Sequence, residues 1–97
     1  MKTVVVRVDE KNSVQKVVRA LKKGKVIIYP TETSYGIGCN ALNASAVKKV
    51  HIIKKEPLSK SLIILVPDLR TAKKFGVLSK QDGLLVKKFM PGPLTLI

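Results

Sequence analysis

Apolar residues recur along this chain in two kinds of pattern, which predict a mixture of strands and helices. Short β-branched or continuous apolar runs indicate strands, and apolar residues spaced three or four positions apart indicate helices with a polar outer face. The predicted strands cover residues 3–8, 25–29, 61–66 and 94–97. The predicted helices follow capping residues at Asn12 or Ser13, Asn43, Asp68 and Ser79.

Strands that are separated by helical segments indicate an α/β fold, with a twisted mixed sheet flanked by helices. The apolar run at 61–66 is typical of a buried central strand, because such strands lack polar alternation. Residues 31–40 are expected to be irregular or extended, with Gly36 and Gly38 allowing tight backbone geometry. The last predicted strand reaches the final residue, so residues 1–97 are expected to form one truncated domain.

The charge of the chain adds a class of partner to this picture. Nineteen Lys and Arg against six Asp and Glu give a formal net charge of +13. Such a field attracts phosphates, nucleotides and nucleic acids. Aromatic residues make up only 4% of the chain, which argues against stacking of bases on aromatic platforms. Most individual lysines are better explained as solvated helix positions, so the charge indicates phosphate attraction without defining a site.

Composition and local patterns also exclude several classes of protein. A single cysteine excludes an internal disulfide framework and a cysteine-based zinc finger, and one histidine with few acidic residues offers little material for a metal cage. The longest uncharged apolar run, at 62–67, is too short to span a bilayer. The first residues show no signal-peptide pattern, and a cytoplasmic location is expected.

Two further patterns match catalytic motifs only loosely. Residues 36–41 fit the dinucleotide pattern G-x-G-x-x-A, but the next helix cap comes later, at Asn43, so a Rossmann turn is not expected. Cys39 and His51 would need to lie within hydrogen-bond reach to act as a nucleophile pair. The sequence instead favours a small buried thiol and a partly exposed helical imidazole.

A cluster of polar groups follows the strand predicted at 25–29. Residues 31–35 carry three hydroxyls, a carboxylate and a phenol. Hydroxyls on a constrained turn at a strand end can bind a small polar ligand, such as an amino acid or a phosphate. The alternative, which the residues alone slightly favour, is an ordinary turn whose hydroxyls satisfy local backbone groups.

A basic loop connects the second predicted helix to the strand at 61–66. It carries Lys54, Lys55 and Lys60. Ligands bind at strand ends in open α/β sheets, and lysines there would neutralise phosphate charge and stabilise a transferring phosphoryl group. A solvated basic loop explains the same spacing equally well.

Three segments together resemble the YrdC-like family, the threonylcarbamoyl-adenylate synthases. Residues 30–39, with the sequence PTETSYGIGC, look like the family pattern P-T-E-T-x-Y-G-L-G-C. The loop at 54–62 is similar to the family segment K-x-R-P-x-x-K-P-L, and residues 91–95 look like the P-G-P-x-T turn. The order and spacing agree over essentially the whole chain, which corresponds to the N-terminal half of the family's domain.

The resemblance implies an activity, its ligands and its site residues. Family members use ATP, L-threonine and bicarbonate to make threonylcarbamoyl-adenylate and pyrophosphate, with Mg²⁺ expected to assist. A transferase then passes the threonylcarbamoyl group to tRNA. Carried over to this chain, Thr33 would contact threonine, with Thr31 and Tyr35 shaping the pocket. Lys54 would contact the ATP phosphates, and Lys60 would add positive potential.

Several positions depart from the family pattern. Glu56 stands where the family carries Arg, which replaces a phosphate-binding cation by an anion. Ser61 replaces a proline, and Leu65 replaces a threonine-contacting histidine of some members. The family's later S-x-N nucleotide motif is absent from these 97 residues. Two alternatives therefore stay open, a non-catalytic module that binds tRNA or double-stranded RNA and a scaffold half that folds only with another chain.

Overall fold

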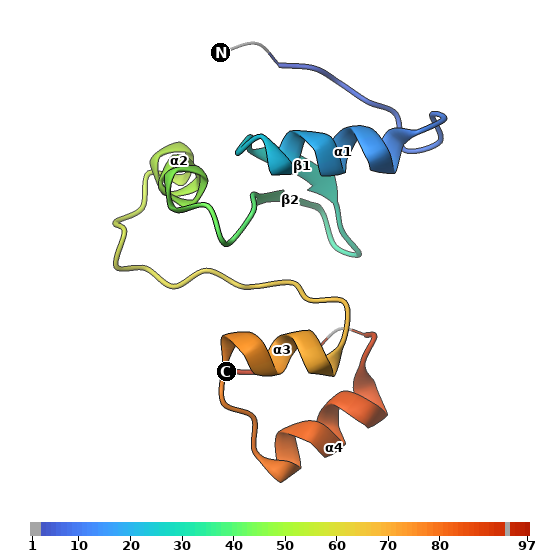
Figure 1. Ribbon diagram of the computed structural model, residues 1–97, viewed down its shortest axis with the longest axis vertical. Coiled ribbons are helices and arrows are strands. Elements are labelled where there is room, and N and C mark those ends of the chain that lie inside the picture. The colour runs from blue at the N-terminus through green and yellow to red at the C-terminus, as the bar shows by residue number, and fades with distance from the viewer. Residues whose placement is uncertain (1–2, 93) are drawn as a thin grey trace. The chain divides into compact units, whose positions relative to one another are not determined.

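A computed structural model describes residues 3–92 and 94–97 (Figure 1). In chain order it contains α1 (Ser13–Lys22), β1 (Ile27–Pro30), β2 (Tyr35–Gly38), α2 (Ala44–Lys54), α3 (Leu69–Phe75) and α4 (Lys80–Phe89). Two compact units divide the chain: unit 1 is Met1–Leu62, with α1, β1, β2 and α2, and unit 2 is Ile63–Ile97, with α3 and α4. Pro93, within the turn predicted at 91–95, lies outside the described residues.

Helix α1 begins without a side-chain cap and is followed by a left-handed glycine. Asn12 occupies the N-cap position at φ 64°, but its side chain makes no capping hydrogen bond. The helix contacts β1, and Val17 and Leu21 are half-buried, while Val14 and Val18 on the same apolar stripe are exposed. After the helix, Gly24 adopts φ 76°, a left-handed conformation that glycine reaches without a steric penalty.

Strands β1 and β2 form an antiparallel hairpin in which one tyrosine faces two glycines. Tyr29 pairs with Gly36, and Ile27 pairs with Gly38. A Cβ atom built on either glycine would lie 3.0 Å from an atom of the Tyr29 ring. Gly36 and Gly38 therefore leave room for this ring, and they lie inside a strand, not at the strand–helix junction that a dinucleotide-binding turn requires.

The sheet is smaller than the sequence predicts. It contains two antiparallel strands, β1 and β2, and the segments at 3–8, 61–66 and 94–97 do not form strands. Apolar side chains alone do not make a strand, because the backbone must hydrogen-bond to a neighbouring edge. In the described part of the chain no such edge pairs with these segments. The run at 61–66, predicted to be a buried central strand, instead leaves Ile63 and Leu65 each 73% exposed.

The core of unit 1 centres on α2. Ala46 and Val50 are the buried apolar residues of the described chain, and His51, which follows Val50, is buried as well. The Oδ1 atom of Asn43 accepts a 3.0 Å hydrogen bond from the Ala46 N–H, which confirms the predicted cap. The Nζ atom of Lys49 donates to the Gly24 carbonyl at 3.4 Å, so α2 is tied to the turn that follows α1.

Unit 2 contains two short helices whose predicted caps are confirmed. Asp68 Oδ1 accepts a 2.7 Å hydrogen bond from the Thr71 N–H at the start of α3. Ser79 and Asp82 form a reciprocal capping box at the start of α4, with hydrogen bonds of 3.1 and 2.8 Å. None of the helices described is both long and apolar enough to cross a membrane.

Acidification is expected to fray the start of α3. The backbone N–H of Thr71 donates to the carboxylate and lowers the pKa of Asp68 below its ordinary value. Because the folded-state pKa is the lower one, this stabilisation is complete above the unfolded-state pKa and is lost as the pH falls through the folded-state pKa. NMR Cα shifts of residues 69–75, followed from about pH 6 to about pH 2, measure the loss of helix.

The matched control for this titration is Asp68→Asn. Asparagine caps helices about as well as aspartate but does not titrate in this range. We expect the variant to keep its helical shifts on acidification. Equal loss of helix in the wild type and in Asp68→Asn would contradict the prediction.

Candidate functional site

The turn between β1 and β2 is held together by the hydroxyl of Thr31. Its Oγ1 atom accepts hydrogen bonds from the N–H groups of Thr33 and Ser34, at 3.3 and 3.1 Å, and donates to the Ser34 carbonyl at 2.8 Å. The Thr31 N–H also donates to the Ser34 carbonyl, at 2.7 Å. A hydroxyl has one proton and two lone pairs, so these bonds use its full capacity. Thr31 thus satisfies local backbone groups, as the alternative interpretation of this turn anticipates.

The other two predicted threonine-site residues are accessible. Thr33 Oγ1 lies 3.3 Å from Thr31 Oγ1, whose bonding capacity is already used, so the Thr33 hydroxyl can bond a ligand. Tyr35 pairs with Pro30 across the hairpin and is 75% exposed. The turn is therefore an open, ordered surface on which the Thr33 hydroxyl is available for binding.

The lysine loop, residues 54–60, begins at a left-handed turn that ends α2. Lys55 has φ 55°, and the N–H groups of Lys55 and Glu56 donate to the carbonyls of Ile52 and His51 at 3.1 and 3.0 Å. This pair of bonds is the Schellman arrangement, here with lysine in place of the usual glycine. Pro57 follows, where the helix cannot continue. The turn reverses the chain and returns Glu56 toward the last turn of α2.

Glu56 lies between the two lysines predicted to bind phosphate. Its Oε2 atom is 3.4 Å from Lys54 Nζ, and its Oε1 atom accepts a 3.1 Å hydrogen bond from Lys60 Nζ. The hydrogen bond from Lys60 and the charge of Lys54 lower the pKa of Glu56 below its ordinary value, although partial burial acts in the opposite direction. The two lysines therefore already share an anion.

The end of α2 also holds two buried polar atoms without a hydrogen-bond partner in the described chain, His51 Nδ1 and Glu56 Oε2. The prediction of a partly exposed imidazole is wrong, because His51 is buried and only 3% exposed. Cys39 is half-buried, and burial raises the pKa of its thiol, which disfavours the reactive thiolate. No hydrogen bond joins Cys39 to His51 among the described residues.

The predicted site residues thus form two local groups. Thr31 and Thr33 share the hairpin turn, and Lys54 and Lys60 share Glu56. Within the described ranges no hydrogen bond or ion pair links one group to the other. The same residues contain no group of three or more His, Cys, Asp or Glu side chains that could hold a metal ion.

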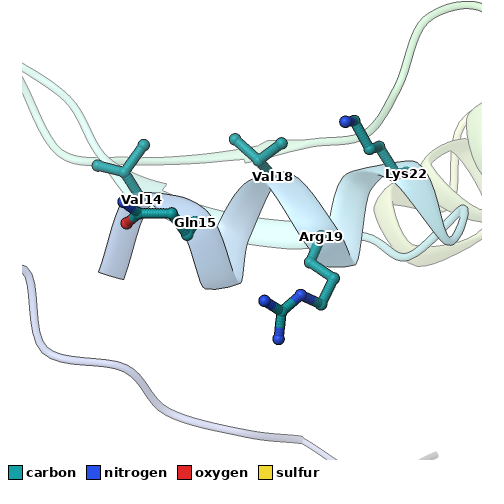
Figure 2. Close-up of a pocket in the computed structure, with 5 residues that line it drawn as sticks. All are labelled: Val14, Gln15, Val18, Arg19 and Lys22. Atoms are coloured by element: carbon teal, nitrogen blue, oxygen red, sulfur yellow. The ribbon is translucent and has the colours of Figure 1, made fainter. Parts of the chain in front are cut away.

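A shallow groove of unit 1 lies elsewhere, on the outer face of α1 (Figure 2). Figure 2 shows Val14, Val18 and Lys22 in a row along this helix, at a spacing of four residues, with Gln15 and Arg19 beside them. None of the predicted site residues lines it. Sequence reasoning missed this groove because an apolar helical stripe is normally read as core.

Comparisons with known proteins add independent information. The profile of the Sua5/YciO/YrdC family, described as "Telomere recombination", matches residues 19–97. A Methanocaldococcus jannaschii protein provisionally named threonylcarbamoyl-AMP synthase is 39% identical over 100% of this chain and 50% of its own length. The threonylcarbamoyl-AMP synthase of Pyrococcus abyssi is 36% identical over 98% of this chain and 29% of its own length.

A solved structure is also similar. A double variant of P. abyssi Sua5 matches with a TM-score of 0.71 and 33% identity, over 86% of this chain and 26% of the larger one. The chain spans half the length of the M. jannaschii protein and less of the two P. abyssi chains. Because the family profile matches most of its residues, the chain belongs to the Sua5/YciO/YrdC family.

Proposed function

We propose that this chain is the N-terminal part of a threonylcarbamoyl-AMP synthase. Such an enzyme joins ATP, L-threonine and bicarbonate into threonylcarbamoyl-adenylate and releases pyrophosphate, and its product serves a transferase that modifies tRNA. The observation that carries the proposal is the 39% identity to the M. jannaschii protein over the whole chain. In the larger domain, residues 61–66 and 94–97 would join a twisted mixed sheet flanked by helices.

The hairpin turn is the proposed threonine site. Thr31 fixes the backbone of the turn through its hydroxyl, which leaves the Thr33 hydroxyl to bond the amino acid. Tyr35, at the first position of β2, would form the adjacent wall of the pocket. A preordered turn lowers the entropy cost of binding, because the hydroxyl does not need to be fixed when the ligand arrives.

Lys54 and Lys60 are the proposed phosphate contacts. In the reaction, an oxygen of the threonine carbamate attacks the α-phosphorus of ATP, and the bond from that phosphorus to the bridging oxygen of pyrophosphate breaks. Both reactants are anions, so fixed cations must offset their repulsion as charge develops. The ammonium of Lys54, at the end of α2, and that of Lys60, six residues later, supply this charge from one short loop.

The lysine loop is a poor site for Mg²⁺, the metal that the resemblance implies. Mg²⁺ prefers oxygen ligands and is commonly held by one or two carboxylates together with substrate phosphates. Glu56 is the carboxylate of the lysine loop, and its two oxygens each face an ammonium group. In this arrangement the carboxylate of Glu56 does not fit a divalent cation.

Pyrophosphate release tests the proposed function. Residues 1–97 are fused to the part of the M. jannaschii protein that they do not cover, and pyrophosphate is measured with ATP and bicarbonate, with and without L-threonine. We expect release that depends on L-threonine. L-valine is the matched control, since it has nearly the same shape but lacks the hydroxyl that Thr33 would bond. A folded fusion with no threonine-dependent release would count against the proposal.

Binding of double-stranded RNA or tRNA without catalysis is a second candidate function. It is favoured by one observation, that Glu56 cancels one of the two positive charges of the lysine pair on a chain whose net charge is +13. In that case RNA affinity should fall steeply with salt and should not change in Lys54→Ala. Salt-dependent RNA binding that is lost in Lys54→Ala would contradict this second candidate.

A further inference from the structure

Two ion pairs hold the carboxylate of Glu56, and a different feature weakens each of them. Lys60 Nζ makes a hydrogen bond to Oε1, but Lys54 Nζ stands 3.4 Å from Oε2 and makes no hydrogen bond to it. The Glu56 side chain is 17% exposed, whereas that of Lys60 is 58% exposed. Solvent and salt therefore weaken the hold of Lys60 on the carboxylate. The glutamate is held, but not so firmly that a stronger anion could not replace it.

The turn that carries Glu56 does not depend on its carboxylate. Backbone hydrogen bonds from Lys55 and Glu56 to the last turn of α2 close the turn, and Pro57 fixes the chain direction after it. The side chain can therefore leave the lysines while the backbone stays in place. A phosphate group offers more charge and more acceptor oxygens than a carboxylate, so both ammonium groups would gain by the exchange.

We propose that Glu56 is an internal occupant of the phosphate position, which a ligand phosphate displaces from Lys54 and Lys60 when it binds. Glu56 thereby lowers the affinity of this lysine pair for phosphate ligands. The inference rests on the proposed function in one respect, since it takes the lysine pair as the phosphate site. Glu56 acts in the opposite direction to a cationic residue at this position, because a cation would raise the affinity for phosphate and Glu56 lowers it.

Calorimetric titration of the 97-residue chain with inorganic tripolyphosphate and with ATP tests the inference. Removing one negative charge at contact distance in Glu56→Gln should tighten tripolyphosphate binding about tenfold at low salt, and added salt should shrink the gain. Glu56→Ala is a second variant that removes the side chain altogether and should tighten binding in the same direction. Circular dichroism of each variant checks that α2 is retained.

Glu10→Gln is the matched control. Glu10, which precedes α1, is paired with Lys16 in that helix. The variant therefore changes the net charge by the same amount but leaves the lysine loop intact. We expect it to bind tripolyphosphate like the wild type. An equal gain in Glu10→Gln and Glu56→Gln would show that net charge alone sets the affinity, which would overturn the inference.

Lys54→Ala separates this inference from the proposed function. If tripolyphosphate binding requires Lys54 but Glu56→Gln does not tighten it, the lysine pair binds phosphate and only the displacement of Glu56 is wrong. If Lys54→Ala leaves tripolyphosphate binding unchanged both in the wild type and in Glu56→Gln, the phosphate site of the proposed function is wrong. This inference is then wrong with it. Carboxyl NMR gives a further readout, because displacement from two ammonium groups should raise the pKa of Glu56 when tripolyphosphate is added.

Discussion

Lys54→Ala is expected to lower threonine-dependent pyrophosphate release by about 100-fold in the fusion with the M. jannaschii segment, the scale found when one stabilising donor is removed from a transition state. The ammonium of Lys54 stands at the end of α2, beside Glu56, where it would face the phosphates. Removing it leaves the repulsion between carbamate and α-phosphate without one of its two nearby cations. Initial rates of pyrophosphate formation, at saturating ATP and threonine, measure the effect.

Two variants control for charge and for shape in this experiment. Lys48→Ala removes the same charge from an exposed position on α2, away from the lysine loop, and should keep the wild-type rate. Lys54→Arg keeps the charge but changes the geometry of its donors, so we expect an intermediate rate. The assigned role of Lys54 would be refuted by a normal rate in Lys54→Ala, or by an equal loss in Lys48→Ala.

Gly24→Ala is expected to destabilise unit 1 by about 2 kcal/mol or more, through left-handed strain and loss of a helix cap. Gly24 is buried at φ 76°, and a Cβ atom there would lie 2.7 Å from Asn43 Nδ2. The same Asn43 side chain caps α2 through its Oδ1 atom, so it cannot move away without breaking that hydrogen bond. The substitution therefore acts on two elements at once.

Urea unfolding followed by tyrosine fluorescence measures this effect in unit 1 alone. The chain has two tyrosines, Tyr29 and Tyr35, and no tryptophan, and both tyrosines lie in the hairpin. Adding Asn43→Ser to Gly24→Ala should recover part of the loss, because serine is shorter and still caps a helix. Gly83→Ala is the matched control: it makes the same change in α4 of unit 2, where nothing lies within 4 Å of the built Cβ atom, and should leave the midpoint of the tyrosine signal unchanged. An unchanged unfolding midpoint in Gly24→Ala would contradict the prediction.

The sequence predicted most helix caps, which depend on near neighbours, but the side-chain cap predicted at Asn12 or Ser13 for α1 does not form. Asn43, Asp68 and Ser79 each cap a helix through a backbone N–H three residues later, which is a local relation that residue type reveals. The strand predicted at 61–66 does not form, and such a strand depends on distant segments. Its apolar composition is visible in the sequence, but a strand also needs a partner edge from a distant segment, and periodicity does not report that edge.

The same distinction applies to the candidate site. The hydroxyls of the turn and the lysines of the loop were visible as clusters, and the change from Arg to Glu at position 56 was visible against the family pattern. The contact of Glu56 with both lysines was not, because it follows from the left-handed conformation of Lys55. Lysine gives no sequence signal for that conformation, whereas glycine would have indicated it.

The open backbone of residues 61–66 also bears on how the protein behaves in concentrated solution. An extended apolar segment with unpaired N–H and C=O groups is a template for the edge of another copy, which is the usual start of aggregation. Mutual repulsion between chains of charge +13 opposes this encounter. That repulsion is screened within about 10 Å at 0.1 M salt. We therefore expect the chains to stay dispersed at low ionic strength and to associate more readily as salt is added.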